Sequence, residues 1–478
     1  MATDSTLNHD ELYIEGRWTP TADRIDVTDL TDDTTFASVS AATPADAEDA
    51  LAAAQAAEAE MRETTVVQRA EWVTAIADGI EARKAELADV IVREAGKPIS
   101  SARGEVDAAA ERFRRAAEEA RSLKGEYIEG TTEGHEGWRA IVRHEPVGTA
   151  LCITPYNYPL STTALQVAPA LAAGNAVILK PASKTPISAA ILAEIIVDAA
   201  EDLPEGAFGF VPGRASEIGD VLAGDDRIDA IAMTGSSGAG KHVAGVSGMV
   251  ELHMELGGNA PAIVFPDADL EAASSAAASG SLKYAGQRCS AVSRVLVHED
   301  AHDELVDRID AEMEGFEPGD LFDEETSLGP LISHEQAEWV EELVEDALDR
   351  GATLVRGGSR SGRFFEPTLL ADVPQDARIV HEEQFGPVVA VTTFDDEAGA
   401  LEVANGGSLG LDAAVFTADY DRAMRVADRL EVGGVRINGA PSHGLGDIPF
   451  GGTKDSGIGR EGIGYTIEAF VERKSIIL

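Results

Sequence analysis

One cysteine of the chain stands in a setting that favours nucleophilic chemistry. Cys289 follows Gly286-Gln287-Arg288 and is one of only two cysteines in 478 residues. A free thiol has a pKa of roughly 8.5, so a reactive cysteine needs a positive neighbour, helix N-terminal amides or a nearby base. Arg288 supplies one adjacent positive charge. A lone cysteine is more often a small buried apolar residue, so its interpretation as a nucleophile depends on the rest of the chain.

Two further segments supply groups that thiol chemistry at a carbonyl carbon requires. Glu255 ends an apolar run and precedes two glycines, which predicts a carboxylate at a strand end, where a raised pKa suits a general base. Asn157 stands in a loop stiffened by two prolines, where its amide is able to donate to a developing oxyanion. Each residue also has a simpler interpretation, a solvated turn glutamate and a turn asparagine.

The glycine-rich segment 235–240 nearly matches the phosphate-binding loop of nucleotide hydrolases. That loop needs Ser or Thr after its lysine to hold Mg²⁺, whereas His242 follows Lys241 here, so an ATPase is disfavoured. What remains is a strand end that leads into a helix, where N-terminal amides bind phosphate.

Composition narrows the class of protein. Hydrophobic cores stop growing at roughly 250–300 residues, so a chain of 478 residues is expected to form two or three domains. Asp and Glu number 85 against 38 Lys and Arg, and the net charge of −47 argues against nucleic-acid binding. A surface poor in lysine and rich in carboxylates is typical of proteins from a salt-saturated cytoplasm, so we expect a halophilic protein.

Several features predict a cytoplasmic location. Two cysteines are too few for a disulfide framework, the first ten residues lack the pattern of a signal peptide, and we find no apolar run long enough to span a membrane. We therefore expect no membrane partner and no bound metal.

The elements expected along the chain form an α/β protein. Short edge strands within 11–40 precede a helix that Thr43-Pro44 opens, a long amphipathic helix over 66–94 and a third helix over 101–123. From residue 149, strands alternate with helices of 10–15 residues, which predicts a parallel sheet that binds ligands at the carboxyl ends of its strands. A second α/β series runs from about 262 to 438.

Two short β segments lack a core of their own. Residues 125–148 alternate between flanking glycines like a hairpin arm, and Lys474–Leu478 is another short strand. We expect these two segments to pair with each other, within one chain or between subunits.

Six motifs in order give the chain a family resemblance. The chain resembles the NAD(P)-dependent aldehyde dehydrogenases over essentially its whole length. The motifs are Thr154-Pro155-Tyr-Asn157-Tyr158-Pro159, Leu179-Lys180-Pro181-Ala182-Ser183, Glu255-Leu256-Gly257-Gly258, Gly286-Gln-Arg-Cys289, Glu382-Glu383-Gln-Phe385-Gly-Pro387, and Pro449-Phe450-Gly-Gly452 with Lys454, Ser456-Gly457 and Gly459-Arg-Glu461.

The resemblance implies two Rossmann-like parallel-sheet domains plus a small β oligomerisation arm. The cofactor-binding domain would be discontinuous over residues 1–124 and 149–256, and the catalytic domain would cover 257–440. Residues 125–148 and 463–478 would form the arm of a homodimer or homotetramer.

Catalytic roles also follow from the resemblance. Cys289 would attack the aldehyde carbon, and Asn157 with the Cys289 backbone N–H would hold the oxyanion of the hemithioacetal. After hydride transfer to the nicotinamide, Glu255 would activate water to hydrolyse the thioester and would also help to deprotonate the thiol.

Cofactor contacts are implied in the same way. Lys180 would bind the adenosine ribose, Glu383 would hold the nicotinamide ribose with Phe385 beside it, and 235–240 would lie near the pyrophosphate. Strongly NAD-selective members carry a glutamate where this chain has Ser183, followed by Lys184, so we expect NADP to be favoured and NAD to remain an alternative. The full set of expected cofactor-binding residues is Thr154, Pro155, Lys180, Ser183, Lys184, Gly235, Ser236, Gly240, Leu256, Glu383 and Phe385.

Substrate residues are harder to assign. Tyr158 and Arg288 are similar to those of the branch with non-phosphorylating glyceraldehyde-3-phosphate dehydrogenase and the lactaldehyde and semialdehyde dehydrogenases. The further arginines of the phosphate-binding branch align with Ala108 and His443, which disfavours phosphate. We expect a small hydroxylated or carboxylated aldehyde, with Phe450 as one wall of its pocket.

Three alternatives stay open at this point. One is a non-phosphorylating glyceraldehyde-3-phosphate dehydrogenase, and another is a thiol acyl hydrolase that uses Cys289 and Glu255 without a cofactor. The third is a catalytically silent homologue, which the presence of Cys289, Glu255 and Asn157 disfavours. Arg288 also has an ordinary interpretation, as half of a structural ion pair.

Overall fold

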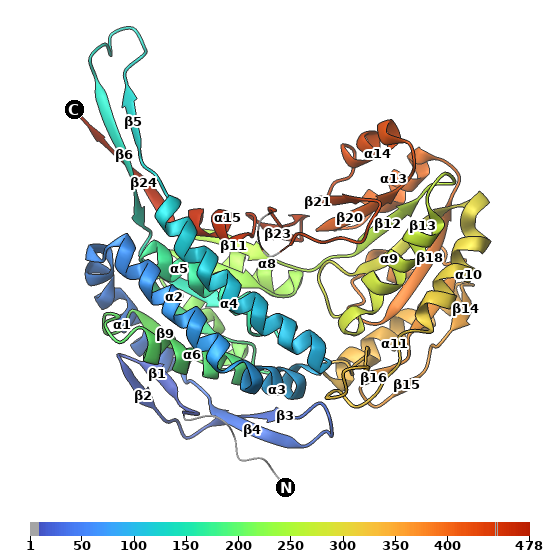
Figure 1. The fold of residues 1–478 in the computed structure, drawn as a ribbon, viewed down its shortest axis with the longest axis horizontal. Helices are drawn as coiled ribbons and strands as arrows, with labels where there is room; N and C mark the ends of the chain where they lie inside the picture. Colours follow the sequence, from blue (N-terminus) through green and yellow to red (C-terminus); the bar gives the residue numbers. More distant parts are fainter. Residues whose placement is uncertain (1–8, 445, 447) are drawn as a thin grey trace.

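Two large sheets form the frame of this computed structural model, which describes residues 9–444, 446 and 448–478 (Figure 1). The first sheet has the strand order β2-β1-β9-β8-β7-β10-β11-β23, in which β9, β8, β7, β10 and β11 are parallel and the edges are antiparallel. Its strands are β1 (Leu12–Ile14), β2 (Arg17–Thr19), β7 (Thr149–Ile153), β8 (Ala176–Lys180), β9 (Phe208–Phe210), β10 (Ala230–Thr234), β11 (Glu251–Glu255) and β23 (Gly457–Ile458).

The second sheet has the order β14-β17-β18-β13-β12-β20-β21, and only β14 runs antiparallel to its neighbour. The strands are β12 (Ala260–Val264), β13 (Val292–His298), β14 (Thr353–Arg356), β17 (Thr368–Ala371), β18 (Val388–Phe394), β20 (Asp412–Phe416) and β21 (Gly434–Ile437). The predicted α/β class with two parallel sheets is confirmed.

Helices cover both faces of the first sheet. On one face lie α5 (Ser161–Ala173) and α6 (Ile187–Ala199), and an outer layer of α2 (Val66–Ala82), α3 (Lys84–Ala95) and α4 (Ile99–Ser122) packs on them. Helix α15 (Ile463–Glu468) belongs to the same core cluster. The other face packs against α1 (Pro44–Glu63), the π-helical turn η1 (Ala215–Gly219), α7 (Asp220–Ala223) and α8 (Ser237–Val246). Because helices cover both faces, a ligand has access to this sheet at its edges. The carboxyl ends of β7, β8, β10 and β11 lie together at one of these edges, as expected for a ligand-binding sheet.

Two of the predicted helices show that local sequence determines a helix start but not every helix break. Thr43 opens α1 with a capping box, because its hydroxyl accepts from the Asp46 amide and the Asp46 carboxylate accepts from the Thr43 amide. The single helix predicted over 66–94 is wrong: the chain breaks at Arg83 into α2 and α3. Arg83 turns to bind Glu86 and the buried Glu194 of α6, and the apolar spacing continues across the break, so periodicity alone does not reveal it.

Carboxylates from the outer helices cap the buried ones. Neither α5 nor α6 has a side-chain cap from its own N-cap residue. Glu105 of α4 instead accepts from the amides of Leu160 and Ser161 at 3.1 and 3.2 Å, at the start of α5. Glu94 of α3 accepts in the same way from the first amides of α6, at 2.8 and 3.0 Å. An N-terminal carboxylate also suits the helix dipole, so these contacts fix both helices against the outer layer.

The second sheet is also sandwiched between helices. α9 (Leu270–Leu282) and α10 (His302–Met313) pack on one face, and α11 (His334–Asp349), α12 (Arg378–His381), α13 (Glu397–Asn405) and α14 (Tyr420–Ala427) lie with the other core cluster. Two 3₁₀ turns, η2 (Lys283–Gly286) and η3 (Glu299–Ala301), follow α9 and precede α10. The remaining strands form small pairs: β3 (Arg24–Thr28) with β4 (Thr35–Ser40), β15 (Arg360–Ser361) with β16 (Phe364–Phe365), and β19 (Leu409–Gly410) with β22 (Thr453–Lys454).

A three-stranded arm projects from the first domain (Figure 1). It consists of β5 (Glu126–Glu129), β6 (Arg139–Pro146) and β24 (Val471–Ile477), in the order β24-β6-β5. The predicted pairing of the hairpin with the last strand is observed within the chain, in the register Lys474 opposite Arg143. The arm exposes the large apolar side chains of Tyr127, Trp138 and Ile477, a feature typical of surfaces that associate with another chain.

One part of the segment expected to form the arm lies elsewhere. Helix α15 packs against α4 and α5, and its Ile463 and Ile467 are buried in the core of the first domain. The arm strand therefore begins only at Val471, and the domain limits drawn from the sequence otherwise stay a prediction. No helix among the described residues is both long and apolar enough to cross a membrane.

The acidic composition generates a prediction about salt. With a net charge of −47, the folded chain repels itself, and the Debye length shortens from about 10 Å at 0.1 M to about 3 Å at 1 M salt. We expect the melting temperature to fall steadily as KCl is lowered from molar to 0.1 M, measured by circular dichroism. Replacing KCl with sucrose of equal osmolality is the control, and a melting temperature independent of KCl would contradict the halophilic interpretation.

Candidate active site

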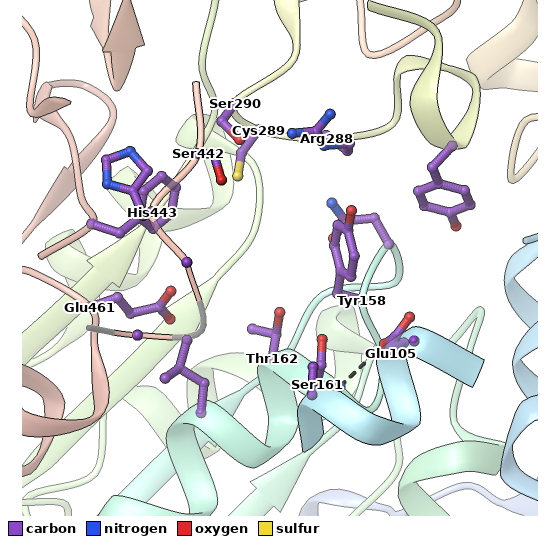
Figure 2. A pocket seen from close by; sticks show the side chains of 18 of the residues that line it. Glu105, Tyr158, Ser161, Thr162, Arg288, Cys289, Ser290, Ser442, His443 and Glu461 are labelled. Carbon is purple, nitrogen blue, oxygen red and sulfur yellow. Dashed lines mark hydrogen bonds between the residues drawn. The ribbon is translucent and has the colours of Figure 1, made fainter. Parts of the chain in front are cut away.

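A cavity of about 590 Å³ lies between the two domains, and the predicted nucleophile faces it (Figure 2). Cys289 and Asn157 both line this cavity, together with all of the residues predicted to bind substrate, Tyr158, Arg288, His443 and Phe450. The start of α5, with Ser161 and Thr162, forms the wall opposite Cys289 in Figure 2. Residues predicted independently from separated motifs thus meet around one space.

The backbone before Cys289 is held in an unusual conformation. Tyr284, Ala285 and Gly286 have φ angles of 56°, 50° and 71°, a run of left-handed residues that costs of order 1 kcal/mol for each non-glycine residue. Any Cβ at Gly286 would overlap the carbonyl oxygen of Gly386, so the loop requires glycine there. The buried Tyr284 hydroxyl donates to the Ala95 carbonyl at 2.7 Å and ties this strained run to the first domain.

The surroundings of Cys289 keep its thiol protonated at rest. Burial raises the pKa of the Cys289 thiol, and the nearby carboxylates of Asp412, Glu255, Glu383 and Glu461 raise it further. The positive charge of Arg288, expected from the sequence to activate the thiol, does not outweigh these effects. The arrangement therefore needs a base that removes the thiol proton when the site is used.

Asn157 is fixed against the nucleophile loop. Its Nδ2 donates to the carbonyl oxygen of Gln287 at 3.0 Å. The Gln287 side chain is held in turn, since its Oε1 accepts from the Ile332 amide at 2.9 Å and its Nε2 donates to the Pro330 carbonyl at 3.3 Å. A side-chain amide has two N–H groups, so one N–H of Asn157 remains for a group in the cavity that it lines.

Two carboxylates lie together beside the cavity. Glu255 ends β11 and is only 1% exposed, and neither of its oxygens has a hydrogen-bond partner among the described residues. Burial and then the charge of Glu461 raise the pKa of Glu255 well above its usual range. Burial raises the pKa of Glu461 to about 7, and Glu461 lines the cavity. Such a pair is able to take up and release protons near neutral pH.

Orphaned polar groups mark the carboxyl edge of the first sheet. Lys180 ends β8, is 5% exposed, and donates only at 3.4 Å to the Pro181 carbonyl, while burial lowers its pKa to about 8. Within the described chain, the Thr154 hydroxyl and the Ser237 hydroxyl at the start of α8 are buried without a partner. Buried polar groups normally find hydrogen bonds, so this edge fits a polar ligand such as a dinucleotide.

The segment 235–240 forms the turn from β10 into α8. Ser236 is the N-cap of α8, and its hydroxyl accepts from the Ala239 amide at 3.3 Å. A Cβ at Gly240 would overlap the Leu256 side chain, so glycine permits the close packing of α8 on the strand end. The first turn of α8 is thereby fixed at the same edge as Lys180.

On the catalytic-domain side, Glu383 accepts from the Gly258 amide at 2.9 Å. Burial raises the pKa of Glu383 to about 7 although this hydrogen bond lowers it. The neighbouring Phe385 has a φ of 48° and its ring meets that of Tyr156 edge-on at 6.0 Å. Glu383 is therefore an acceptor held against the backbone of Gly258.

Ser183 and Lys184 follow the end of β8 at this edge and bring no carboxylate to it. The Ser183 hydroxyl donates to the Gly213 carbonyl at 3.0 Å. Burial lowers the pKa of Lys184, while the charge of Glu335 raises it and that of Arg363 lowers it again. Lys184 is thus close enough to Glu335, in the first turn of α11, for the two charges to interact.

A histidine that is paired with a buried carboxylate lines another part of the cavity. His443 Nε2 lies 2.7 Å from the buried Asp412 carboxylate, and its ring packs against Phe450 with the ring centres 4.8 Å apart. Burial lowers the pKa of His443, but the hydrogen bond and charge of Asp412 outweigh it and raise the pKa overall. Ala108 also lines the cavity and leaves that part of its wall uncharged.

Comparison with known proteins agrees with this geometry. The model of the aldehyde dehydrogenase family matches residues 18–476. The chain belongs to the aldehyde dehydrogenase family. The family resemblance drawn from the six motifs is confirmed, and the protein is an NAD(P)-dependent aldehyde dehydrogenase. Membership decides against the cofactor-independent thiol acyl hydrolase.

Individual relatives of this aldehyde dehydrogenase share about a third of its residues. A 3-sulfolactaldehyde dehydrogenase of Priestia megaterium is 36% identical over 468 residues, which cover 98% of this chain and 97% of the relative. A non-phosphorylating aspartate-semialdehyde dehydrogenase of Halomonas elongata is 40% identical over 85% of this chain and 82% of its own. An NADP complex of the NADP-dependent glyceraldehyde-3-phosphate dehydrogenase of Bacillus halodurans aligns with a TM-score of 0.96, at 36% identity over 98% and 99% of the two chains.

Several residues of the site escaped the sequence analysis. Lys97, Glu105, Arg112, Lys283 and Glu461 all line the cavity, yet they were assigned no role. Glu461 stood inside a recognised motif, and Lys283 lies six residues before Cys289, so proximity to a motif was the available signal. Nothing local marks the others, because folding brings them to the cavity from α4 and the turn before it.

The glycine at the nucleophile loop generates a prediction. We expect Gly286→Ala to reduce kcat/KM by at least about 100-fold and to lower the melting temperature, because the Cβ would overlap the Gly386 carbonyl in a left-handed conformation. Gly245→Ala is the matched control, since a Cβ there meets nothing within 4 Å in helix α8. Equal activity in the two variants would show that the loop geometry does not control the nucleophile.

Proposed function

We propose that this enzyme oxidises a small polar aldehyde to the carboxylic acid with NAD(P)⁺, using Cys289 as the nucleophile. The observation that carries the proposal is the meeting of Cys289 with the free N–H of Asn157 at one cavity, beside the Glu255–Glu461 pair. Glyceraldehyde 3-phosphate, oxidised without phosphorylation, is the alternative substrate, since an NADP-dependent glyceraldehyde-3-phosphate dehydrogenase of Streptococcus equinus is 38% identical over 87% of this chain.

In the first half-reaction, Glu255 takes the proton of the Cys289 thiol. Its carboxylate has no hydrogen-bond partner in the described part of the chain, and its charge contributes to the raised pKa of the thiol. The thiolate sulfur then forms a bond to the aldehyde carbon, and the carbonyl π electrons move to oxygen. The N–H groups of Asn157 and of the Cys289 backbone stabilise this oxyanion. Return of the oxyanion electron pair expels a hydride, which the nicotinamide accepts when bound.

In the second half-reaction, water hydrolyses the resulting thioester. Glu255 removes a proton from the water as its oxygen bonds to the thioester carbon, and the carbon–sulfur bond then breaks to release the acid and the Cys289 thiolate. Glu461 interacts electrostatically with Glu255, whose pKa it raises, and it also lines the cavity. We assign it to the exchange of protons between Glu255 and water in the cavity.

The cofactor would lie along the carboxyl edge of the first sheet. Lys180 and Ser183 would hold the adenosine ribose, the turn at Gly235, Ser236 and Gly240 would face the pyrophosphate, and Glu383 with Phe385 would hold the nicotinamide end. The remaining predicted contacts are Thr154, Pro155, Lys184 and Leu256. Support comes from the orphaned Thr154 hydroxyl and the poorly satisfied Lys180, which a dinucleotide would complete.

The location and assembly expected from the sequence stay proposals. We place the enzyme in the cytoplasm as a homodimer or homotetramer, joined through the arm of β5, β6 and β24, without nucleic acid or membrane as a partner. The exposed apolar side chains of the arm support self-association. The mass in solution, compared with 50.1 kDa for one chain, tests the assembly.

Removing the nucleophile separates chemistry from cofactor binding. We expect Cys289→Ala to lower kcat by at least about 10³-fold, because covalent catalysis is lost while the residues at the sheet edge remain. NADPH binding, followed by the change in its fluorescence, should keep its Kd within about twofold. Cys152→Ala is the control, since Cys152 is fully buried in β7 away from the cavity. Loss of NADPH binding in Cys289→Ala would contradict this division of roles.

Cofactor preference is predicted to depend on residue 183. In Ser183→Glu, the new carboxylate would repel a 2′-phosphate and accept from a ribose 2′-hydroxyl. We expect the ratio of kcat/KM for NADP over NAD to fall by at least tenfold relative to the parent enzyme. Ser183→Ala controls for loss of the hydrogen bond to the Gly213 carbonyl. An unchanged ratio in Ser183→Glu would refute the assignment of this position to the ribose.

A further inference from the structure

The cavity gathers positive charge in a protein that is strongly acidic. Lys97, Arg112, Lys283 and Arg288 all line it, although Lys and Arg number only 38 against 85 Asp and Glu in the whole chain. Three of the four lie within electrostatic range of one another, since the charges of Lys283 and Arg288 both lower the pKa of Lys97. Like charges near one another destabilise the protein unless something compensates them, so this cluster calls for an explanation.

Lys97 is compensated inside the protein. Its ammonium group binds the Glu105 carboxylate, and it lies 3.5 Å from the centre of the Tyr158 ring and 4.5 Å from that of Tyr284. Both Lys97 and Glu105 are almost fully buried. The carboxylate and the two ring faces satisfy this cation, so it forms part of the cavity wall and leaves no demand for an external anion.

Lys283 and Arg288 are not compensated in this way. No carboxylate among the residues that the structure describes forms an ion pair with either side chain, and neither head group makes a hydrogen bond there. Burial lowers the pKa of Lys283, and the charge of Arg288 lowers it further. Many arginines that the structure describes have acidic partners, as Arg83 and Arg93 do. The other arginine of the cavity wall, Arg112, donates to the Ser161 carbonyl and lies in the field of Glu461 and Glu105. Lys283, which is exposed to solvent, and the half-buried Arg288 therefore remain as the cations free to meet a ligand.

The strained turn determines where these two cations lie. Lys283 immediately precedes the left-handed run 284–286, and Arg288 immediately precedes Cys289. The turn thereby presents both cations on the approach to the nucleophile. In Figure 2, Arg288 and Tyr158 lie to one side of Cys289, whereas His443 and Glu461 lie to the other. His443 is already paired with Asp412, so the two sides of the cavity differ in the charge they offer.

We propose that Lys283, together with Arg288, binds an anionic end group of the aldehyde substrate and makes the enzyme selective for anionic aldehydes. This inference rests on the proposed function, because it orients the substrate with its carbonyl carbon at Cys289. The tail of the substrate then points toward the cations and away from Glu461. The shared chemistry is a carboxylate, sulfonate or phosphate one short chain away from the aldehyde carbon. Lys283 is the new specificity-determining residue.

The test compares two substrates that differ only in charge. Succinate semialdehyde carries a carboxylate, and its primary amide, 4-oxobutanamide, is a neutral molecule of nearly the same shape. We expect the parent enzyme to have a higher kcat/KM for the anion than for the amide. In Lys283→Met, the kcat/KM for the anion divided by that for the amide should fall by about 10- to 100-fold, because a hydrogen bond to a charged group is lost. The change should appear mainly in KM, and Lys283→Arg should restore most of the ratio.

Lys124→Met is the matched control, because it removes the same charge from an exposed position beyond the end of α4. It should leave the ratio within about twofold of the parent value. Parallel assays with sulfonate- and phosphate-terminated aldehydes identify which anion gives the highest kcat/KM. An unchanged ratio in Lys283→Met overturns the inference even if the parent enzyme oxidises both substrates well. Failure of the parent enzyme to oxidise any aldehyde would instead refute the proposed function.

Discussion

The carboxylate of Glu105 connects the parts of the structure on which the active site depends. It accepts from the first amides of α5 through one oxygen and from Lys97 through the other, all of them buried. Removing one partner from a buried ion pair typically costs 3–5 kcal/mol, because the other charge is left unpaired. Glu105 thus fixes the start of α5 immediately after the loop that carries Asn157 and Tyr158. The rings that cover Lys97 extend this connection to Tyr284 and the nucleophile loop.

The site concentrates groups that are costly to bury. Glu255, Glu383 and Glu461 all have pKa values raised by burial, so each favours its protonated form in the folded state. For a carboxyl group whose pKa is raised on folding, stability falls as the pH rises from the unfolded value toward the folded one. For Glu383 and Glu461 this window extends from about 4.5 to about 7. The free energy of unfolding is therefore reduced near neutral pH, in the same range where these carboxylates are able to exchange protons.

Sequence analysis predicted the parts of the molecule that local patterns encode. The strands around 149–256, the cap at Thr43 and the placement of Cys289, Asn157 and Arg288 at one cavity follow from periodicity, capping and motif recognition. The break at Arg83 was missed because one of the two carboxylates that hold Arg83, that of Glu194, lies more than a hundred residues away in the sequence. The raised pKa of the Cys289 thiol was not foreseen, since it depends on burial and on the charges of four carboxylates from separate segments. Contacts between distant segments determine such features, and no short window of sequence contains them.

The acidic surface would repel the anionic substrate that the basic side chains of the cavity are proposed to bind. A net charge of −47 repels anions at low ionic strength, and that long-range repulsion would slow their encounter with the cavity. At molar salt, screening acts within about 3 Å, so the surface field decays before it reaches an approaching molecule. Lys283 and Arg288 act only at contact, inside a partly enclosed cavity where salt screens charges less. Concentrated salt would therefore suppress the unfavourable long-range charge while it preserves the favourable short-range one, which reconciles a strongly acidic exterior with selection for an anion.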